Sequence, residues 1–353
     1  MKQTFTHGVP VLNNDFCPRA ELALMQKTIE ANKSVYLVGR HKIGKTSAVQ
    51  NLKLTKHFLV NVDFKQVHKK DDILKTVVKA ILQADQSQQA TPDFTALFQK
   101  FNQYGPNVGY VNNQMKFTIN PSVELKVQEV LSLLAPINGK SPILFLDNIQ
   151  QIHKVNKELA TQLVTAALKH LVIFSEAGDI FQTGVKFANL VTKTTYIEMQ
   201  PLDITNYQKY TQAIFQEHNK ELSNEVFTTG LTLAGELSND RQMFFKTLLE
   251  ADTTSYQPYH LEQAMKLVVD QYSDLYEVIW EDLTLNQQNT LQKLADDPEV
   301  RVYSKQFCEE LKIQNTNTVI KILQSLMKKK MVYKQSSSHQ LFSPFFRYWI
   351  NHR

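Results

Sequence analysis

The stretch of residues 35–52 restricts the possible fold more than any other part of the chain. Residues 35–38 are apolar or aromatic and predict a buried strand, residues 39–47 read GRHKIGKTS, and residues 48–52 continue with a helical pattern. A glycine loop between a strand and a helix turns its backbone N–H groups toward an anion, and the helix start adds further N–H groups. The stretch therefore predicts a phosphate-binding loop (P-loop) in an α/β domain with a parallel sheet.

Each residue type in this loop suits a polyphosphate. Glycines at positions 39 and 44 let the backbone curve where a side chain would block the ligand. Lys45 is expected to reach the β- and γ-phosphates, and the Thr46 hydroxyl is expected to bind Mg²⁺. A chance match of a glycine loop is the alternative, and the flanking strand and helix argue against it. The residues predicted to contact the nucleotide here are Gly39, Arg40, Ile43, Gly44, Lys45, Thr46 and Ser47.

A second strand that ends in an acid, residues 143–148 (ILFLDN), is the expected partner of this loop. Asp147 is placed to hold the magnesium shell, although a strand can also end in Asp for other reasons. Asn148 stands where many ATPases have the Glu that orients the attacking water. An amide can hold a water molecule by hydrogen bonds but cannot accept its proton. Hydrolysis is therefore expected to be slow or absent unless another group serves as the base.

Three further strands are predicted at residues 58–64, 171–175 and 195–199. Asp63 lies at the carboxyl edge of the sheet, where ligands bind in open α/β folds, and is a candidate either for magnesium or for capping the next loop. Ser175 occupies a position from which a polar group can contact the γ-phosphate. Glu176 follows it as a candidate substitute base.

An insertion is predicted between the second strand and the strand of residues 143–148. Residues 84–107 are polar and suggest one short helix, residues 108–121 alternate around Asn112-Asn113 as in a hairpin, and residues 122–134 predict another helix.

Downstream of residue 204 the pattern becomes helical, with helices predicted at 205–220, 223–235, 239–250 and 259–282. Such a run suits a helical lid over a nucleotide. Arg241 is a candidate to reach the phosphates from this lid, and a solvated first-turn arginine is the alternative. Arg19, at the start of a short N-terminal helix, is a candidate neighbour of the base or ribose, with a surface arginine as the alternative.

The residues from 285 onward predict a winged helix-turn-helix, with three helices and a small wing around residues 336–338. Residues 301–353 hold ten Lys/Arg and two Asp/Glu, whereas residues 1–300 hold 29 and 32. This basic segment points to a polyanion such as duplex DNA. A basic last helical turn favoured by the helix dipole, and a lid or protein-binding role, are the alternatives. The candidate DNA contacts are Lys321, Lys328, Lys329, Lys330 and Lys334.

The composition is that of an ordinary globular protein, with 42% hydrophobic and 21% charged residues. Cys17 and Cys308 have no paired spacing, which excludes a disulfide scaffold or a cysteine metal site and suits a reducing cytosol. No apolar stretch approaches the ~20 residues of a membrane span, and no signal peptide is visible. We therefore expect a soluble, cytoplasmic protein without a membrane partner.

Four stretches together carry a family resemblance: Phe16-x-x-Arg19, the loop of residues 39–47, residues 146–152 (LDNIQQI) and residues 342–350 (FSPFFRYWI). With them the chain resembles the archaeal-type ATPases, P-loop proteins of the STAND/AAA+ group with a C-terminal winged helix. That family usually has Asp-Glu-Phe-Gln where this chain has DNIQ at 147–150, and Gly-Ser where it has SEA at 175–177. The resemblance implies ATP and Mg²⁺ as ligands, and the two departures weaken the carry-over of catalysis but not of nucleotide binding.

These observations predict three domains: a P-loop core over residues 1–203, an all-helical lid over 204–284 and a winged helix over 285–353. The expected function is an ATP-driven switch in which the nucleotide repositions the winged helix. The expected catalytic residues are Lys45, Asp147, Asn148 and Glu176. One rival is a scaffold that binds ATP without hydrolysing it, and another is a DNA-binding ATPase of the loader or regulator type.

Overall fold

A computed structural model describes residues 3–12, 15–87, 107–111, 114–118, 125–178, 187–335 and 338–353. The chain forms two compact units. Pro18–Gln200 form one, here called the sheet unit, and Met1–Cys17 with Pro201–Arg353 form the other, here called the helical unit. The predicted lid and winged helix thus share one compact unit, and residues 1–17 belong to it rather than to the core in which the sequence analysis placed them.

The sheet unit is built on a parallel sheet with the order β2-β5-β6-β1-β7. The predicted strands are confirmed. The three central strands are apolar runs buried on both faces, whereas the two edge strands are partly exposed. The strands are β1 (Val35–Gly39), β2 (His57–Asp63), β5 (Ser141–Asp147), β6 (Val172–Ala177) and β7 (Thr195–Glu198). Their carboxyl ends lie at one edge, and every predicted site residue of this unit except Arg19 lies at or just beyond that edge.

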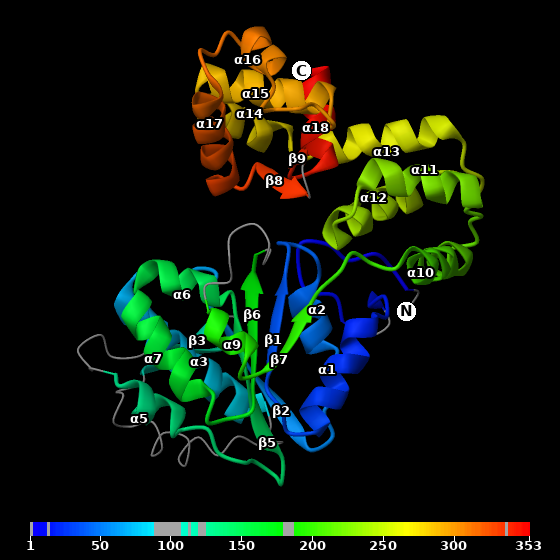
Figure 1. Ribbon diagram of the computed structural model, residues 1–353. Helices are drawn as coiled ribbons and strands as arrows, with labels where there is room; N and C mark the ends of the chain where they lie inside the picture. The colour runs from blue at the N-terminus through cyan, green and yellow to red at the C-terminus, as the bar shows by residue number, and fades with distance from the viewer. Residues whose placement is uncertain are drawn as a thin grey trace. The chain divides into compact units, whose positions relative to one another are not determined.

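Helices cover both faces of this sheet (Figure 1). On one face lie α1 (Ala20–Glu30) and α2 (Lys45–Gln50), which contact β1. The opposite face packs against a core cluster that includes side chains of the remaining helices. These helices are α3 (Lys70–Ser87), α5 (Val127–Leu131), α6 (Ile149–Val155), α7 (Lys157–Ala167) and α9 (Ala188–Val191).

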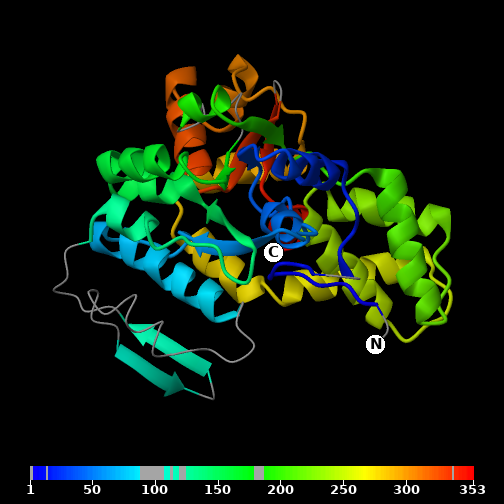
Figure 2. The same cartoon turned by 90° about the horizontal axis from the view of Figure 1, so that it is seen from below.

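The insertion contains the predicted hairpin. β3 (Asn107–Val111) pairs antiparallel with β4 (Gln114–Thr118) as a separate two-stranded sheet (Figure 2). The helix expected over residues 122–134 is described only from residue 125, and there it is shorter, because α5 ends at Leu131. The short helix expected within residues 84–107 lies largely outside the described residues.

The first half of the helical unit contains the expected helical run: α10 (Ile204–Glu217), α11 (Asn224–Ala234), α12 (Ser238–Glu250), α13 (Pro258–Asp270) and α14 (Ser273–Glu281). Asp203 and Ser223 cap two of these helices with their side chains. The single helix predicted at 259–282 is wrong. It breaks at Gln271-Tyr272 into α13, which packs against α12 and the helix of residues 344–352, and α14, whose Tyr276 and Trp280 pack against Trp349 of that same helix.

The second half has the winged-helix arrangement. Its elements are α15 (Leu285–Asp296), α16 (Lys305–Glu310), α17 (Thr316–Lys328), the wing strands β8 (Val332–Gln335) and β9 (Ser338–Leu341), and α18 (Pro344–His352). Asn315 caps α17 as predicted. The sequence analysis did not anticipate α18, which Ser343 caps and which buries Phe345, Phe346 and Ile350.

The N-terminal segment packs into the aromatic core of this helical unit, because Phe5 lies among the rings of Tyr210, Phe215 and Phe245. Among the described residues, no helix combines the length and the apolar character that crossing a bilayer requires.

Candidate nucleotide-binding site

The loop between β1 and α2 has the backbone that the sequence predicted. Gly44 has a φ of 101°, which only glycine adopts without strain, and Lys42 is left-handed with a φ of 64°. A Cβ on Gly39 would lie 3.0 Å from Met199 Cβ, so the residue that follows β7 packs too closely for any side chain there. Both glycines are therefore required by the local geometry.

Lys45 is turned into its own loop. Its side chain is buried, and Nζ donates hydrogen bonds to Gly39 O at 2.8 Å and to Arg40 O at 3.0 Å. This places an ammonium group within the ring of loop backbone, where phosphate oxygens are expected to bind.

The structure brings Thr46 and Asp147 together although 101 positions separate them. Thr46 Oγ1 donates a 2.6 Å hydrogen bond to Asp147 Oδ2. Burial raises the pKa of the Asp147 carboxyl, and Thr46, Ser175 and Lys45 lower it in part. Ser175 Oγ is buried and makes no hydrogen bond within the described residues, although it is close enough to Asp147 to affect that pKa. The buried Asp147 carboxylate thus lies beside two hydroxyls. That of Thr46 is hydrogen-bonded to it, and that of Ser175 has no hydrogen-bond partner within the described residues.

These groups fit a magnesium ion. A hydroxyl and a carboxylate are hard oxygen donors of the kind that Mg²⁺ selects, and Mg²⁺ in nucleotide sites usually takes one or two protein ligands with phosphate and water as the rest. The described residues contain no group of three or more His, Cys, Asp or Glu that would form a protein cage. The donor set thus matches an ion held mainly by a nucleotide.

Asn148, at the predicted base position, is held by its neighbours. It adopts a left-handed conformation (φ 58°, ψ 40°) at the start of α6, and its N–H donates to Asp147 Oδ1. Its side-chain Nδ2 donates to Asp63 Oδ1 at 2.9 Å, and its Oδ1 accepts from Gln150 Nε2 at 3.3 Å. The amide is therefore engaged at both ends.

Asp63 and Gln150 extend this network to the neighbouring strands. Asp63 Oδ1 also accepts from Lys65 N at 2.8 Å, which confirms that Asp63 caps the following loop. Gln150 Oε1 accepts from Ala177 N at 3.1 Å and so reaches the end of β6. The sequence analysis missed Gln150, because no pattern in the chain indicates that its amide spans two strand ends.

Glu176 lies on the opposite face of β6 from Ser175, because successive side chains of a strand alternate. Its carboxylate is buried and accepts a hydrogen bond from the Tyr36 hydroxyl. Burial and the Glu176 carboxylate raise the pKa of Tyr36, which keeps the phenol protonated as the donor. Glu176 therefore has a structural hydrogen-bond partner in Tyr36. The sequence analysis missed Tyr36, because it stands within an apolar strand and belongs to no motif.

Arg19 is not a surface residue. Its side chain is buried, and Nη2 donates to Ile43 O at 2.7 Å while Nη1 donates to Gln200 O at 2.9 Å. Its guanidinium also lies 3.5 Å from the place of a Cβ on Gly44. Arg19 therefore supports the loop from outside, and its predicted contact with base or ribose stays a prediction. The predicted loop residue Ser47 is buried in the first turn of α2.

Arg241, in the helical unit, is likewise buried rather than solvated. Nε donates to Gly235 O at 2.7 Å, Nη1 donates to Leu202 O at 3.2 Å, and the guanidinium lies over the Tyr207 ring. These contacts hold α12 against Leu202 and the Tyr207 ring at the beginning of the helical run. The predicted contact with the phosphates stays a prediction.

The candidate basic residues of the winged helix lie within α17, just after its end and on β8. Lys321, Lys328, Lys329 and Lys330 are exposed, and Lys334 is half-buried. Lys329 forms an ion pair with Asp282. The positive charge predicted from the sequence is thus at the surface, with one member neutralised by a neighbouring acid.

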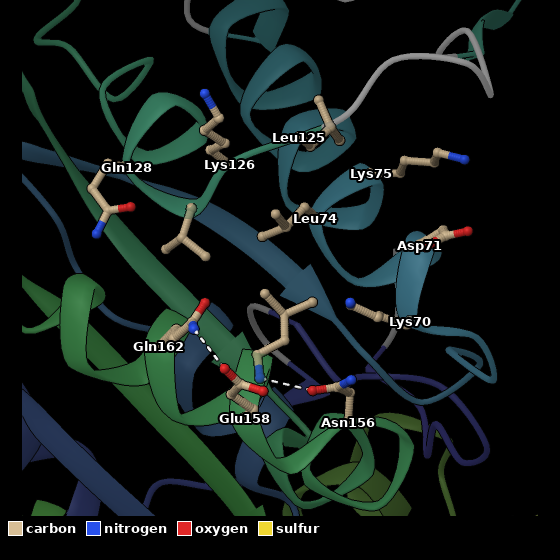
Figure 3. Close-up of a pocket in the computed structure, with 12 residues that line it drawn as sticks. Lys70, Asp71, Leu74, Lys75, Leu125, Lys126, Gln128, Asn156, Glu158 and Gln162 are labelled. Atoms are coloured by element: carbon tan, nitrogen blue, oxygen red, sulfur yellow. Dashed lines mark hydrogen bonds between the residues drawn. The ribbon is translucent and has the colours of Figure 1, made fainter.

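A separate cleft in the sheet unit lies between α3, α5 and α7 and has a volume of about 460 Å³ (Figure 3). Asn156 accepts a hydrogen bond from Leu159 N there, and Gln162 contacts Glu158. The side chains of Asp71, Lys75 and Lys126 extend away from its centre. None of the predicted site residues lines this cleft.

Known structures support the fold. A Walker-type ATPase of Pyrococcus abyssi is similar over 96% of this chain and 97% of its own, with 15% identity and a TM-score of 0.65. Cdc6p of Pyrobaculum aerophilum aligns over 99% of this chain and 96% of its own, with 13% identity and a TM-score of 0.43. A STAND protein of Pyrococcus horikoshii with a tetratricopeptide repeat sensor aligns over 99% of this chain but 44% of its own, with 14% identity and a TM-score of 0.36. The last two scores lie below 0.5, so the fold assignment rests on the Pyrococcus abyssi protein.

A sequence family also matches the C-terminal part of the chain. A family described as a probable winged helix domain matches residues 274–352. A comparison with curated proteins gave no match. The resemblance to P-loop ATPases with a C-terminal winged helix is thus confirmed at the level of the fold.

Proposed function

We propose that this protein binds ATP with Mg²⁺ and hydrolyses it. The single observation that carries the proposal is the 2.6 Å hydrogen bond between Thr46 of the loop and Asp147 at the end of β5. A hydroxyl and a carboxylate that meet beside a buried lysine and a glycine loop are the groups that position a metal-bound nucleotide. The fold, shared with a Walker-type ATPase, supports the same function.

The loop residues have distinct tasks in this function. The N–H groups between residues 39 and 46 bind the phosphates, and Lys45 exchanges its two carbonyl partners for β- and γ-phosphate oxygens. Thr46 and Asp147 would hold Mg²⁺, which neutralises charge on the phosphates when it is bound. Ser175, buried beside Asp147, is available to donate a hydrogen bond to a ligand oxygen.

The nucleotide state is proposed to act on the rest of the chain through Arg19. The chain passes between the two units at residues 17–18 and again at 200–201. Arg19 hydrogen-bonds the loop carbonyl of Ile43 and the carbonyl of Gln200, so one side chain links the loop to both crossing points. A change in the loop conformation on ATP binding would alter the hydrogen bonds that Arg19 makes to Ile43 O and Gln200 O. This is the route by which we propose that the nucleotide repositions the winged helix.

Calorimetry and turnover together test the proposal. Wild-type protein is expected to bind MgATP and to release phosphate, whereas Lys45→Ala is expected to lose about 100-fold or more in turnover, as when a charge-stabilising group is removed. Lys53→Ala is the matched control, because it removes an exposed lysine just beyond α2. Absence of binding heat at millimolar MgATP would overturn nucleotide binding, and wild-type turnover no higher than that of Lys45→Ala would overturn hydrolysis.

Duplex DNA is a second candidate ligand, favoured by the exposed lysines at the end of α17. Fluorescence anisotropy at low salt tests it, and each phosphate contact contributes a slope of about −0.9 in log affinity against log salt. Lys328→Ala is expected to reduce this slope, whereas Lys266→Ala on α13 leaves it unchanged. No affinity at low salt would leave a protein partner as the candidate for the winged helix.

A further inference from the structure

The carboxyl edge of the sheet carries a second carboxylate on the same face as Asp147. Asp63 pairs in register with Asp147 on the neighbouring parallel strand, so their side chains project from the same face about 4.8 Å apart in strand spacing. On the other side, Ser175 lies next to Asp147 and influences its pKa. Asp63, Asp147 and Ser175 therefore form a row across β2, β5 and β6.

We propose that Asp63 is the general base of ATP hydrolysis and that Asn148 is the positioning residue that holds it. The proposal rests on the proposed ATPase function and assigns the role that the sequence left open at Asn148. It also explains why an amide follows Asp147: Nδ2 of Asn148 donates to Asp63 Oδ1 at 2.9 Å, which a carboxylate at position 148 could not do.

Asp63 has the freedom that a base requires. Its Oδ1 accepts hydrogen bonds from Lys65 N and Asn148 Nδ2, which fix the orientation of the carboxylate. Its Oδ2 makes no hydrogen bond within the described residues, and the side chain is exposed. One oxygen is thus held and the other is open to a water molecule.

The other candidates lack this freedom. The Asn148 amide is engaged at both ends and has no lone pair basic enough to take a proton. The Glu176 carboxylate is buried, holds the Tyr36 hydroxyl and lies on the other face of the sheet from Asp147. Asp63 is the remaining carboxylate in the row beside Asp147.

The proposed step conserves atoms and charge. The oxygen of the attacking water forms a bond to the γ-phosphorus while Oδ2 of Asp63 takes one of the water protons. The bond between the γ-phosphorus and the β–γ bridging oxygen breaks, and ADP leaves with its electron pair. The proton then passes from Asp63 to solvent, which restores the carboxylate and leaves ADP and inorganic phosphate.

Asp63→Asn tests the role directly, because it keeps the shape and removes the basic oxygen. We expect turnover to fall about 100-fold or more, the usual contribution of a general base, while KM and MgATP affinity by calorimetry stay close to those of the wild type. Asp71→Asn, which changes an exposed aspartate in the first turn of α3, is the matched control. Thermal denaturation verifies that both variants are folded.

Moving the carboxylate supplies the second test. Asn148→Glu alone is expected to lower turnover, because it removes the amide that donates to Asp63 Oδ1 and places a second carboxylate beside the first. The double variant Asp63→Asn/Asn148→Glu is expected to recover most of the turnover that Asp63→Asn loses, since it restores one carboxylate to the pair.

The outcomes separate this proposal from the function on which it rests. Turnover in Asp63→Asn within threefold of the wild type would overturn the role of Asp63 and leave the ATPase intact. Wild-type turnover at the level of Lys45→Ala would overturn both hydrolysis and the base, and calorimetry would still decide nucleotide binding on its own.

Discussion

The carboxyl ends of β1 and β5 would bind the proposed nucleotide in different ways. After β1 the chain acts through its backbone, because Gly39 and Gly44 are required by a close approach and a positive φ. After β5 it acts through side chains, and Asp147 and Asn148 depend on partners in α2 and β2. A site built by the backbone needs glycines at fixed positions, which can be recognised in the sequence. A site built by side chains can be formed by different residues from different elements. The glycine loop after β1 therefore predicts phosphate binding well, whereas the residues after β5 predict catalysis poorly.

The largest effect expected from the β5 end is that of Asp147→Asn. Loss of the charge that would hold the metal is expected to reduce Mg²⁺-dependent turnover by about 100-fold or more. Phosphate release measured over a range of Mg²⁺ concentrations checks this. Chelation of Mg²⁺ from the wild type should reproduce the effect, and turnover that survives both changes would contradict the assignment.

The same variant makes a prediction about pH. Burial raises the pKa of Asp147, so the folded protein holds this proton at a pH where the unfolded chain has lost it. The free energy of unfolding of the ligand-free wild type should therefore fall as pH rises between the unfolded and the folded pKa. Asp147→Asn should lack this dependence and be the more stable protein at neutral pH. Urea denaturation of both proteins at several pH values measures the difference, and parallel profiles would contradict it.

Gly39→Ala is expected to act at the β1 end with a smaller effect. The added Cβ would lie 3.0 Å from Met199 Cβ, and relief of this contact shifts the loop at a cost of about 1–3 kcal/mol of stability. MgATP affinity by calorimetry should fall with it. Gly139→Ala is the control, because its Cβ meets no atom within 4 Å; unlike Gly39, Gly139 has a positive φ of 76°, so this variant reports backbone strain without close packing. Equal effects of the two variants on affinity would show that close packing at the loop is unimportant.

The smallest effect is expected from Glu176→Gln. Its side chain holds Tyr36 rather than the loop, so it should contribute little to the difference between ground and transition state, and turnover should change less than about threefold. Tyr36→Phe should lower the thermal stability without changing KM, since it removes one partner of a buried carboxylate at about 1–3 kcal/mol. A loss of about 100-fold in Glu176→Gln would instead identify Glu176 as the base and contradict the assignment of Asp63.

Much of the fold could be predicted because its strands are short apolar runs bounded by polar residues, and because Asn315 marks a helix start. The break at Gln271-Tyr272 could not, since the helical spacing continues across it and the contacts of Tyr276 and Trp280 with Trp349 join residues far apart in the chain. The burial of Phe5 in the helical unit also depends on long-range contacts that leave no periodic pattern.

The candidate site divides along the same line. Thr46 and Asp147 lie together and Lys45 points into its own loop, because the motif spacing and the parallel strands fix their positions, while their roles toward a nucleotide stay predictions. Ser175 and Glu176 were both expected at the site, yet adjacent residues of a strand face opposite sides, so alternation alone should have separated them. The pairing of Asp63 with Asn148 could not be foreseen, because nothing in the sequence indicates which strands are neighbours.

The hydrogen bonds of Lys45 to Gly39 O and Arg40 O have a consequence for selectivity. A nucleotide that enters the loop would replace these two carbonyl acceptors. Its affinity therefore depends on the difference between the hydrogen bonds that Lys45 gains to phosphate and those that it loses to the loop. The oxygens expected to reach this ammonium are those of the β- and γ-phosphates, which a triphosphate supplies and a monophosphate lacks. The loop should thus rank adenine nucleotides steeply by the number of their phosphates, and would do so even if the adenine were bound weakly.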